Sequence, residues 1–365
     1  MTIVFIIDGL AGGGAEKVVL TLAGAMSKQG HDVTILSLRE EQAYAIPDGV
    51  KLIKVIDNYR GPLRRQTEIY RRARQLDQAI VKHFAHRPID LAISNLPKTD
   101  RIVAHSQYLQ DAWMCLHGAV ASTQLAHKHG LKRWLKQRQL QRTYEGRNWI
   151  SVSAGLGEDM INLAACYPRK VCTIPNPFDI QSIQQAAKKP CPLEGEHFII
   201  HMGRFHPVKR HDRLLKAFQL SQYTGKLVLL GTGSQEEIKQ IKACCQQLGI
   251  TDRIVFAGFT ENPYPYLRVA EALVLSSDYE GFGNALVEAL ACGTAVVSTR
   301  CPYGPETILT GELAKGLADL TPESLAQKLD AVLNHPVKAT SKQLDLFAID
   351  HVVKQYLALA SNRKQ

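Results

Sequence analysis

Short apolar, β-branched runs alternate along the chain with longer stretches in which apolar residues recur at helical spacing. The first run, residues 3–7, predicts a buried strand, and residues 15–28 predict the helix that follows it. Further strands are expected at residues 33–38, 51–55, 91–94, 112–116 and 149–152. Helices are expected between most of these strands, the longest at residues 63–84 and 123–144. Because strand–helix–strand repetition is typical of parallel strands covered on both faces, this half predicts a doubly wound α/β domain.

The same alternation restarts after turn-rich stretches at residues 174–177 and 188–192. The strands expected there are residues 197–202, 226–230, 253–256, 272–275 and 295–298. The helices expected there are residues 208–220, 235–248 and 284–291. The pattern therefore predicts an α/β protein with two doubly wound, Rossmann-like domains that face each other across a cleft.

The domain boundaries follow from the same pattern. We expect domains at residues 1–175 and 176–346, with a linker near residues 176–192. Residues 347–365 then form a C-terminal helix, which packs on the second domain or crosses back to the first. Since ligands of open α/β sheets bind at the carboxyl ends of the strands, site residues are sought directly after strands.

Composition narrows the class of protein. A chain of 365 residues with 45% hydrophobic and 21% charged residues is long enough for two full cores and is not a disordered protein. No stretch reaches the ~18 apolar residues of a membrane span. The eight cysteines form no C-x-x-C pair, which argues against a zinc site or disulfide framework and fits a reduced cytoplasm. The net charge of +10 favours anionic partners: phosphates, acidic lipid or nucleic acid.

A glycine-rich loop follows the first expected strand and opens the first helix. Gly13 and Gly14 allow the backbone to approach a ligand, and free N–H groups at a helix start favour an anion. The loop is a poor dinucleotide fingerprint, because Lys17 stands where the third small residue should be. A flexible turn without a ligand remains the alternative.

Two cations follow the expected strand at residues 197–202. Arg204 and Lys209 lie five residues apart on a turn and the start of a helix, where they can converge on one anion. Basic residues at a helix start oppose the helix dipole, which makes a purely structural role less favourable. The alternative is a solvated surface pair.

Two acidic residues flank a second glycine-rich turn. Glu280 precedes Gly281, Phe282, Gly283 and Asn284, whose amides open a helix, and Glu288 lies about one turn further along. Carboxylates bind the diols of ribose and sugars. Taken singly, Glu288 is better explained as an exposed helical glutamate and Glu280 as a charge at a helix N-terminus, but the pair predicts diol binding beside an anion site. With Arg204 and Lys209, the chemistry is that of a nucleotide-diphosphate-sugar site.

These motifs resemble those of a known family. Residues 280–288 resemble the E-x7-E motif of retaining glycosyltransferases of GT-B fold, glycosyltransferase family 4, which act in lipopolysaccharide and polysaccharide synthesis. Gly203-Arg204 with Lys209, the loop before residue 15, and residues 174–177 and 258–263 are similar to further motifs of the family, so the resemblance covers nearly the whole chain.

The resemblance implies a role for each of these residues. Arg204 and Lys209 neutralise the donor diphosphate, Glu288 holds the nucleotide ribose, and Glu280 orients the hydroxyls of the transferred sugar. Further donor contacts are implied for Gly13, Gly14 and the residues Gly281, Phe282, Gly283 and Asn284. His117 falls where the family places a histidine that faces the transferred sugar, although a lone histidine after a strand is more often structural. Asn176 is implied on the acceptor side.

Two departures from the family are visible. The usual Gly-x-Pro after the E-x7-E helix is here Gly293-Thr294-Ala295, and the usual Gly-Pro-x-Glu is here Gly304-Pro305-Glu306-Thr307. The second departure moves the acid by one position and leaves the role of Glu306 open. The resemblance implies same-face sugar transfer without a cofactor or divalent metal, and UDP is the donor nucleotide we favour.

Basic residues crowd two segments of the first domain, residues 60–74 and 128–147, and the second contains Trp134 and Leu135. Basic helices with an aromatic residue predict docking on an anionic membrane, with a solvated helix face as the alternative. We therefore expect a cytoplasmic enzyme, peripheral on the inner face of the membrane, with a glycan or lipid-linked acceptor and no nucleic-acid partner. The rival classes are a Rossmann oxidoreductase, a nucleotide-sugar epimerase of the same fold, and a basic nucleic-acid- or membrane-binding module.

Overall fold

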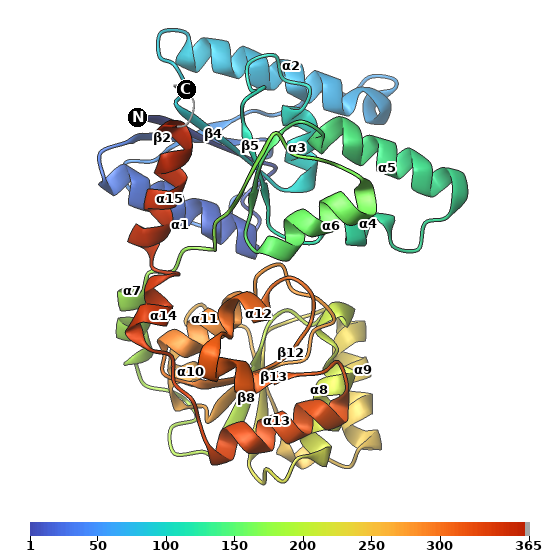
Figure 1. The fold of residues 1–365 in the computed structure, drawn as a ribbon, viewed down its shortest axis with the longest axis vertical. Helices are drawn as coiled ribbons and strands as arrows, with labels where there is room; N and C mark the ends of the chain where they lie inside the picture. The colour runs from blue at the N-terminus through green and yellow to red at the C-terminus, as the bar shows by residue number, and fades with distance from the viewer. Residues whose placement is uncertain (362–365) are drawn as a thin grey trace. The chain divides into compact units, whose positions relative to one another are not determined.

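The computed structural model describes residues 1–361, which fold into two compact units (Figure 1). The N-terminal unit consists of Met1–Pro177 and the C-terminal helix α15 (Ile349–Ser361), and the C-terminal unit is Phe178–Ala348. The divisions fall two residues later than the expected positions at 175 and 346. Helix α15 lies against α1 (Gly14–Lys28) and contacts β4 (Leu91–Asn95), so it belongs to the N-terminal unit.

The N-terminal unit is built on one sheet of seven parallel strands in the order β3-β2-β1-β4-β5-β6-β7. In addition to β4, its strands are β1 (Thr2–Ile7), β2 (Asp32–Ser37), β3 (Lys51–Lys54), β5 (Trp113–Leu116), β6 (Asn148–Ser151) and β7 (Lys170–Thr173). Its remaining helices are α2 (Arg64–Phe84), α3 (Pro97–Val103), α4 (Val120–Leu125), α5 (Gly130–Tyr144) and α6 (Ala154–Ala164).

Helix α2 shows why the sequence pattern predicts these elements. Its buried residues Ile69, Ala73, Leu76 and Ile80 recur at helical spacing and pack in one core cluster with Ile6 of β1. Most polar residues between them are exposed or half-buried, with Arg72 the buried exception, so one face of the helix covers the sheet.

The C-terminal unit repeats the plan with six parallel strands in the order β10-β9-β8-β11-β12-β13. Its strands are β8 (Phe198–Met202), β9 (Lys226–Leu230), β10 (Ile254–Gly258), β11 (Ala272–Leu275), β12 (Ala295–Thr299) and β13 (Leu317–Ala318). Its α-helices are α7 (Ile180–Ala187), α8 (His211–Leu220), α9 (Gln235–Gln247), α10 (Tyr264–Val269), α11 (Asn284–Ala291), α12 (Pro305–Ile308), α13 (Pro322–Asn334) and α14 (Ser341–Asp345). Three 3₁₀ turns are η1 (Pro207–Lys209), η2 (Thr251–Arg253) and η3 (Gly311–Gly316).

Both units are Rossmann-like, because each sheet continues outward on both sides of its first strand. In the N-terminal unit, the strand order therefore reverses between the neighbouring carboxyl ends of β1 and β4. In the C-terminal unit, it reverses between those of β8 and β11. The predicted class of two doubly wound α/β domains is confirmed for each unit.

Three local predictions were wrong. The helix expected at residues 123–144 is broken into α4 and α5, because His127 and Gly130 adopt left-handed backbone conformations with φ of 56° and 52°. The linker expected at residues 176–192 contains the helix α7, which Asp179 caps by accepting from the Ser182 N–H at 3.0 Å. The edge strands β7 and β13 were not predicted: β7 is largely exposed and β13 has only two residues.

Candidate functional site

The first site segment follows β8 and is held by the loop after β11. The Ser276 hydroxyl donates to the Lys209 carbonyl at 2.7 Å, and the Asp278 N–H donates to the Val208 carbonyl at 2.9 Å. The predicted helix at residues 208–220 begins only at His211, because Arg210 is left-handed with φ of 50°. Lys209 therefore lies in the turn η1 and not in the helix.

Ion pairs fix the loop after β11 against α8. Arg210 donates to the Asp278 carboxylate at 3.0 Å, and the buried Arg213 donates to the same carboxylate at 2.8 Å and to the Ser276 carbonyl at 2.7 Å. These bonds cross from one site segment to the other, so the two loops form one rigid edge of the sheet.

The two segments meet at Lys209 and Glu280. The Lys209 Nζ atom lies 2.6 Å from Glu280 Oε1, and the Ser277 hydroxyl donates to the same oxygen at 2.6 Å. Glu280 is only 9% exposed, so its carboxylate is held by a cation and a hydroxyl within the protein. The structure thus brings two of the predicted site residues into direct contact.

Arg204 contrasts with this pair. It lies on the same loop as Lys209 and is exposed, and within residues 1–361 its guanidinium makes no hydrogen bond or ion pair. The fold therefore leaves all five of its N–H donors available for a ligand.

Glu288 and the turn before it form the second part of the site. Glu288 is 8% exposed on α11, and the Tyr264 hydroxyl donates to its Oε1 atom at 3.4 Å. Gly283 begins the helix at φ of 98°, a conformation that favours glycine. The buried Phe282 ring packs against Phe178 and Phe347, so at this position only the backbone can meet a ligand.

The family departure at residues 304–307 lies beside this turn. A Cβ on Gly304 would stand 2.3 Å from the Phe282 carbonyl oxygen, so glycine is required for the close approach of the two backbones. Glu306 is exposed in the first turn of α12 and pairs with Arg300.

Two buried histidines behind Lys209 were not predicted. His201 lies on β8, and its Nδ1 atom is 2.9 Å from the Val274 carbonyl oxygen. The centres of the His201 and His211 rings are 4.8 Å apart. Burial lowers the pKa of His201 to about 4 and also lowers the pKa of His211. Both rings are therefore neutral at pH 7. A polar residue inside an apolar strand was the available sequence signal.

The remaining predicted residues lie on the N-terminal unit. Gly13 caps α1 and Gly14 begins it, while the preceding Gly12 has φ of 104°. Asn176 is buried in the segment after β7. These residues and His117 therefore share a unit with one another and not with Arg204.

His117 follows β5, and its hydrogen bonds define its tautomer. Its Nε2 atom is 2.9 Å from Asn95 Oδ1, and the Asn95 amide group donates to the Ile6 and Ile93 carbonyls. Because Asn95 Oδ1 must accept, Nε2 carries the proton and Nδ1 keeps a lone pair. Burial lowers the pKa of His117 to about 4, so the ring is neutral at pH 7. It can accept a hydrogen bond but does not supply a positive charge.

The basic segment at residues 60–74 is only partly exposed. Arg72 is buried and bonds to Asp8, Glu68 and the Leu38 carbonyl, and Arg71 pairs with Asp57 at 2.6 Å. These two arginines are held within the fold, so they are not available to a membrane, while Arg60, Arg64, Arg65 and Arg74 of the segment are exposed.

The segment at residues 128–147 presents a different surface. Leu131, Trp134 and Leu135 are 69%, 51% and 54% exposed on one face of α5, and the Arg138 guanidinium lies 5.5 Å from the centre of the Trp134 ring. We call the exposed residues Leu131, Lys132, Trp134, Leu135 and Arg138 the α5 face. Arg147 does not belong to it, because it bonds to Gln110 and the Ala104 carbonyl.

Residues 1–361 contain neither a cluster of metal-ligating side chains nor a membrane-spanning helix. No group of three or more histidine, cysteine, aspartate or glutamate side chains there could hold a metal ion. Within the same residues, no helix combines the length and the apolar composition that crossing a bilayer would require.

Comparison with known proteins agrees with this architecture. Residues 12–182 match the family described as Glycosyltransferase Family 4, and residues 183–345 match the family described as Glycosyl transferases group 1. Among solved structures, Anabaena HepE in complex with UDP and glucose superposes with a TM-score of 0.71 at 19% identity, over 100% of this chain and 95% of that one. A glycosyltransferase from Rickettsia africae gives 0.76 at 16% identity, over 100% and 98%.

Two curated relatives are more similar in sequence. An N-acetylgalactosaminyltransferase from Campylobacter jejuni, whose name specifies a diphospho-undecaprenol acceptor, is 33% identical over 147 residues, or 40% of each chain. The lipopolysaccharide 1,6-galactosyltransferase of Escherichia coli is 32% identical over 167 residues, or 44% of this chain and 45% of that one. The chain thus matches less than half the length of these relatives.

Two Rossmann-like units built on parallel sheets are the architecture of the class of GT-B proteins. The two matched regions together span residues 12–345, and the chain belongs to the glycosyltransferases of this fold.

Proposed function

We propose that the chain transfers a sugar from a nucleotide-diphosphate donor, preferably a UDP-sugar, to a glycan or lipid-linked acceptor in cell-envelope polysaccharide synthesis. The observation that carries the proposal is the edge formed by Arg204, Lys209 and Glu280, where an unpaired guanidinium stands on the same loop as Lys209, whose ammonium group pairs with the buried Glu280. The names of the relatives support the acceptor class: one acts on a lipid-linked diphosphate and one on lipopolysaccharide.

The proposed roles are those that the family resemblance implies, and the contact of Lys209 with Glu280 supports them. Arg204 and Lys209 bind the donor diphosphate, and Lys209 retains two N–H donors beyond the one that meets Glu280. Glu280 orients the sugar hydroxyls, Glu288 binds the ribose, and the amides of residues 281–284 contact the donor at the start of α11. On the N-terminal unit, Gly13, Gly14 and the Nδ1 atom of His117 contact the donor, and Asn176 contacts the acceptor.

The proposed reaction retains the configuration of the sugar. The bond between the anomeric carbon and the diphosphate oxygen breaks, the bond to the acceptor oxygen forms on the same face, and the acceptor proton passes to the departing diphosphate. Negative charge develops on the diphosphate, where the two cations stabilise it. Since side chains supply this charge, we propose that the reaction needs neither a divalent metal nor a cofactor.

A donor screen tests the proposal. UDP-sugars are expected to raise the unfolding temperature more than GDP- or ADP-sugars, since bound ligands stabilise the native state. The preferred donor should then give a product with an unchanged anomeric configuration by NMR, at an undiminished rate in EDTA. Stabilisation by none of these donors would contradict the proposal. Formation of a free epimer of the sugar would favour the epimerase. Oxidation or reduction of an added nicotinamide cofactor would favour the oxidoreductase.

We further propose that the α5 face docks on an anionic membrane surface and makes the enzyme peripheral to the cytoplasmic side of the membrane. Three exposed apolar side chains accompany the exposed charges of Lys132 and Arg138 on this helix. An apolar stripe inserts between lipids while basic residues meet acidic headgroups, and this arrangement supports surface binding better than a solvated helix does.

Replacing Lys132→Glu and Arg138→Glu is expected to weaken co-sedimentation with phosphatidylglycerol vesicles by about tenfold or more, because each basic residue near such a surface contributes about 1 kcal/mol. The matched control is Lys338→Glu with Lys342→Glu, which makes the same charge change at exposed positions of the C-terminal unit. Equal binding of both variants, or equal wild-type binding to phosphatidylcholine vesicles, would contradict the docking.

A further inference from the structure

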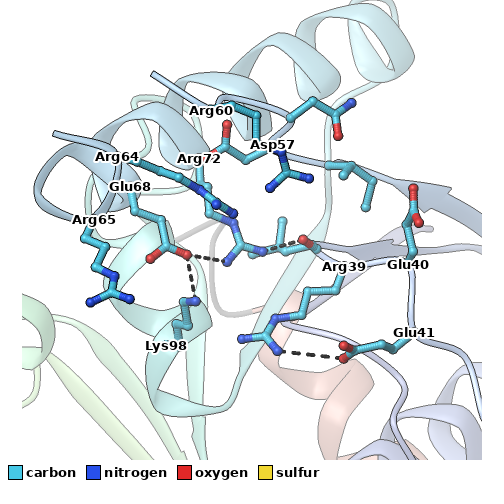
Figure 2. A pocket seen from close by; sticks show the side chains of 13 residues that line it. Arg39, Glu40, Glu41, Asp57, Arg60, Arg64, Arg65, Glu68, Arg72 and Lys98 are labelled. Atoms are coloured by element: carbon cyan, nitrogen blue, oxygen red, sulfur yellow. Dashed lines mark hydrogen bonds and ion pairs between the residues drawn. The ribbon is translucent and has the colours of Figure 1, made fainter. Parts of the chain in front are cut away.

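A pocket of about 710 Å³ lies at the carboxyl edge of the sheet in the N-terminal unit (Figure 2). Residues 38–41 after β2, residues 56–58 after β3 and Lys98 after β4 line it, and the start of α2 forms a further side. Six of its thirteen lining residues are basic and four are acidic. We call this cavity the α2 pocket. None of the residues assigned to donor binding lines it.

Most of its acidic side chains are already paired. Glu68 accepts from Lys98 at 2.7 Å and from Arg72 at 3.2 Å, as the dashed lines in Figure 2 show. Burial alone would raise the pKa of Glu68, but these two cations lower it below its usual value. The carboxylate is therefore ionised at pH 7, and it neutralises cations that line the pocket floor.

The other acids of the pocket are engaged in the same way. Asp57 pairs with Arg71 at 2.6 Å, and Glu41 lies 3.7 Å from Arg39, which also pairs with Asp8 at 2.9 Å. Among the acidic lining residues, only Glu40 lacks a side-chain partner within residues 1–361.

Three arginines remain unpaired. Arg60, Arg64 and Arg65 are exposed, line the pocket on its α2 side, and make no side-chain hydrogen bond or ion pair within the described chain (Figure 2). Arg64 and Arg65 are the first two residues of a 21-residue helix, where the helix dipole is positive. The first turn of α2, all of it described, has no acidic side chain. This accumulation of positive charge is unfavourable without an anion.

We propose that the α2 pocket binds a phosphate or diphosphate group of the acceptor, with Arg60, Arg64 and Arg65 as its ligands. The inference rests on the proposed transferase function, since it assigns the anion to the acceptor. A guanidinium binds phosphate oxygens with a two-pronged fork, and the several oxygens of a phosphate group can engage more than one fork. A single carboxylate would satisfy only one of the three arginines. A lipid-linked diphosphate and a phosphorylated glycan both supply this chemistry.

Isothermal titration of the full-length protein saturated with UDP tests the pocket, because the donor site is then filled before inorganic pyrophosphate is added. The pocket variant is Arg64→Ala with Arg65→Ala. The matched control is Arg74→Ala with Lys82→Ala, which removes two charges from exposed positions of the same helix outside this pocket. We expect pyrophosphate to bind the pocket variant at least about tenfold more weakly than the wild type or the control, since a charged hydrogen bond contributes about 1.5–3 kcal/mol. UDP affinity should stay unchanged in both variants.

Farnesyl diphosphate and glucose 6-phosphate, titrated in the same way, separate the two sources. Tighter binding of the prenyl diphosphate supports a lipid-linked acceptor, and tighter binding of the sugar phosphate supports a phosphorylated glycan. Either result supports the proposal that the α2 pocket binds a phosphate group. Equal pyrophosphate affinity of the pocket variant and the wild type, or an equal loss in the control, would overturn it. Failure of the wild type to bind any of UDP, GDP and ADP would instead contradict the proposed function, so the two failures are distinguishable.

Discussion

Arg204→Ala is expected to lower the turnover number for sugar transfer by about 10²–10³-fold, the loss typical of removing one preorganised charge that stabilises a developing anion. Arg204 is exposed and makes no side-chain hydrogen bond or ion pair within the described residues, so its removal costs the fold little. The unfolding temperature should therefore change by no more than about 2 °C. Release of UDP and formation of the glycosidic product provide the two rates.

Lys216→Ala is the control for this experiment. Lys216 is an exposed cation on α8 of the same unit, outside the site. It should retain wild-type turnover. A turnover of Arg204→Ala within about threefold of the wild type would show that the guanidinium is not part of the leaving-group site.

Glu288→Gln is expected to weaken UDP binding by about 10–100-fold, because a hydrogen bond to a charged group contributes about 1.5–3 kcal/mol. The substitution keeps the size of the side chain but removes the charge that would accept from the two ribose hydroxyls. It therefore tests recognition of the diol without leaving a cavity beneath α11. Titration calorimetry with UDP measures the change.

Glu236→Gln makes the same chemical change at an exposed position of α9 and should leave UDP affinity unaltered. An unchanged UDP affinity of Glu288→Gln would show that Glu288 does not bind the ribose. A loss for UDP together with an equal loss for inorganic pyrophosphate would show that Glu288 acts on the phosphates and not on the ribose.

The sequence predicted the central strands well because they are buried on both faces. Such strands contain continuous apolar runs, as in residues 3–7 and 227–230. The edge strand β7 has exposed and half-buried residues and no apolar run, so the same argument could not find it.

Local backbone conformation limited the prediction of the site. The contact of Lys209 with Glu280 depends on the left-handed Arg210, which ends the turn η1 before α8 begins. An arginine rarely adopts this conformation, and here its side chain is held by ion pairs to Asp212 and Asp278. Those partners lie two and 68 residues away, and a pattern of hydrophobic positions carries no information about them.

The basic segment at residues 60–74 shows the same limit for charge. Composition counts Arg64 and Arg72 alike, but the fold buries Arg72 among Asp8, Glu68 and a carbonyl and leaves Arg64 unpaired at a pocket. The sequence thus indicated an anionic partner without locating it. The difference between a structural and a ligand-binding arginine appears only when the partners of each are known.

The most direct test of the proposed donor site is a crystal structure of the protein soaked with a UDP-sugar. The account predicts the diphosphate within hydrogen-bonding distance of Arg204 and Lys209, with the ribose at Glu288 and the transferred sugar at Glu280. A nucleotide bound elsewhere, with Arg204 still exposed and Lys209 still contacting only Glu280, would contradict it.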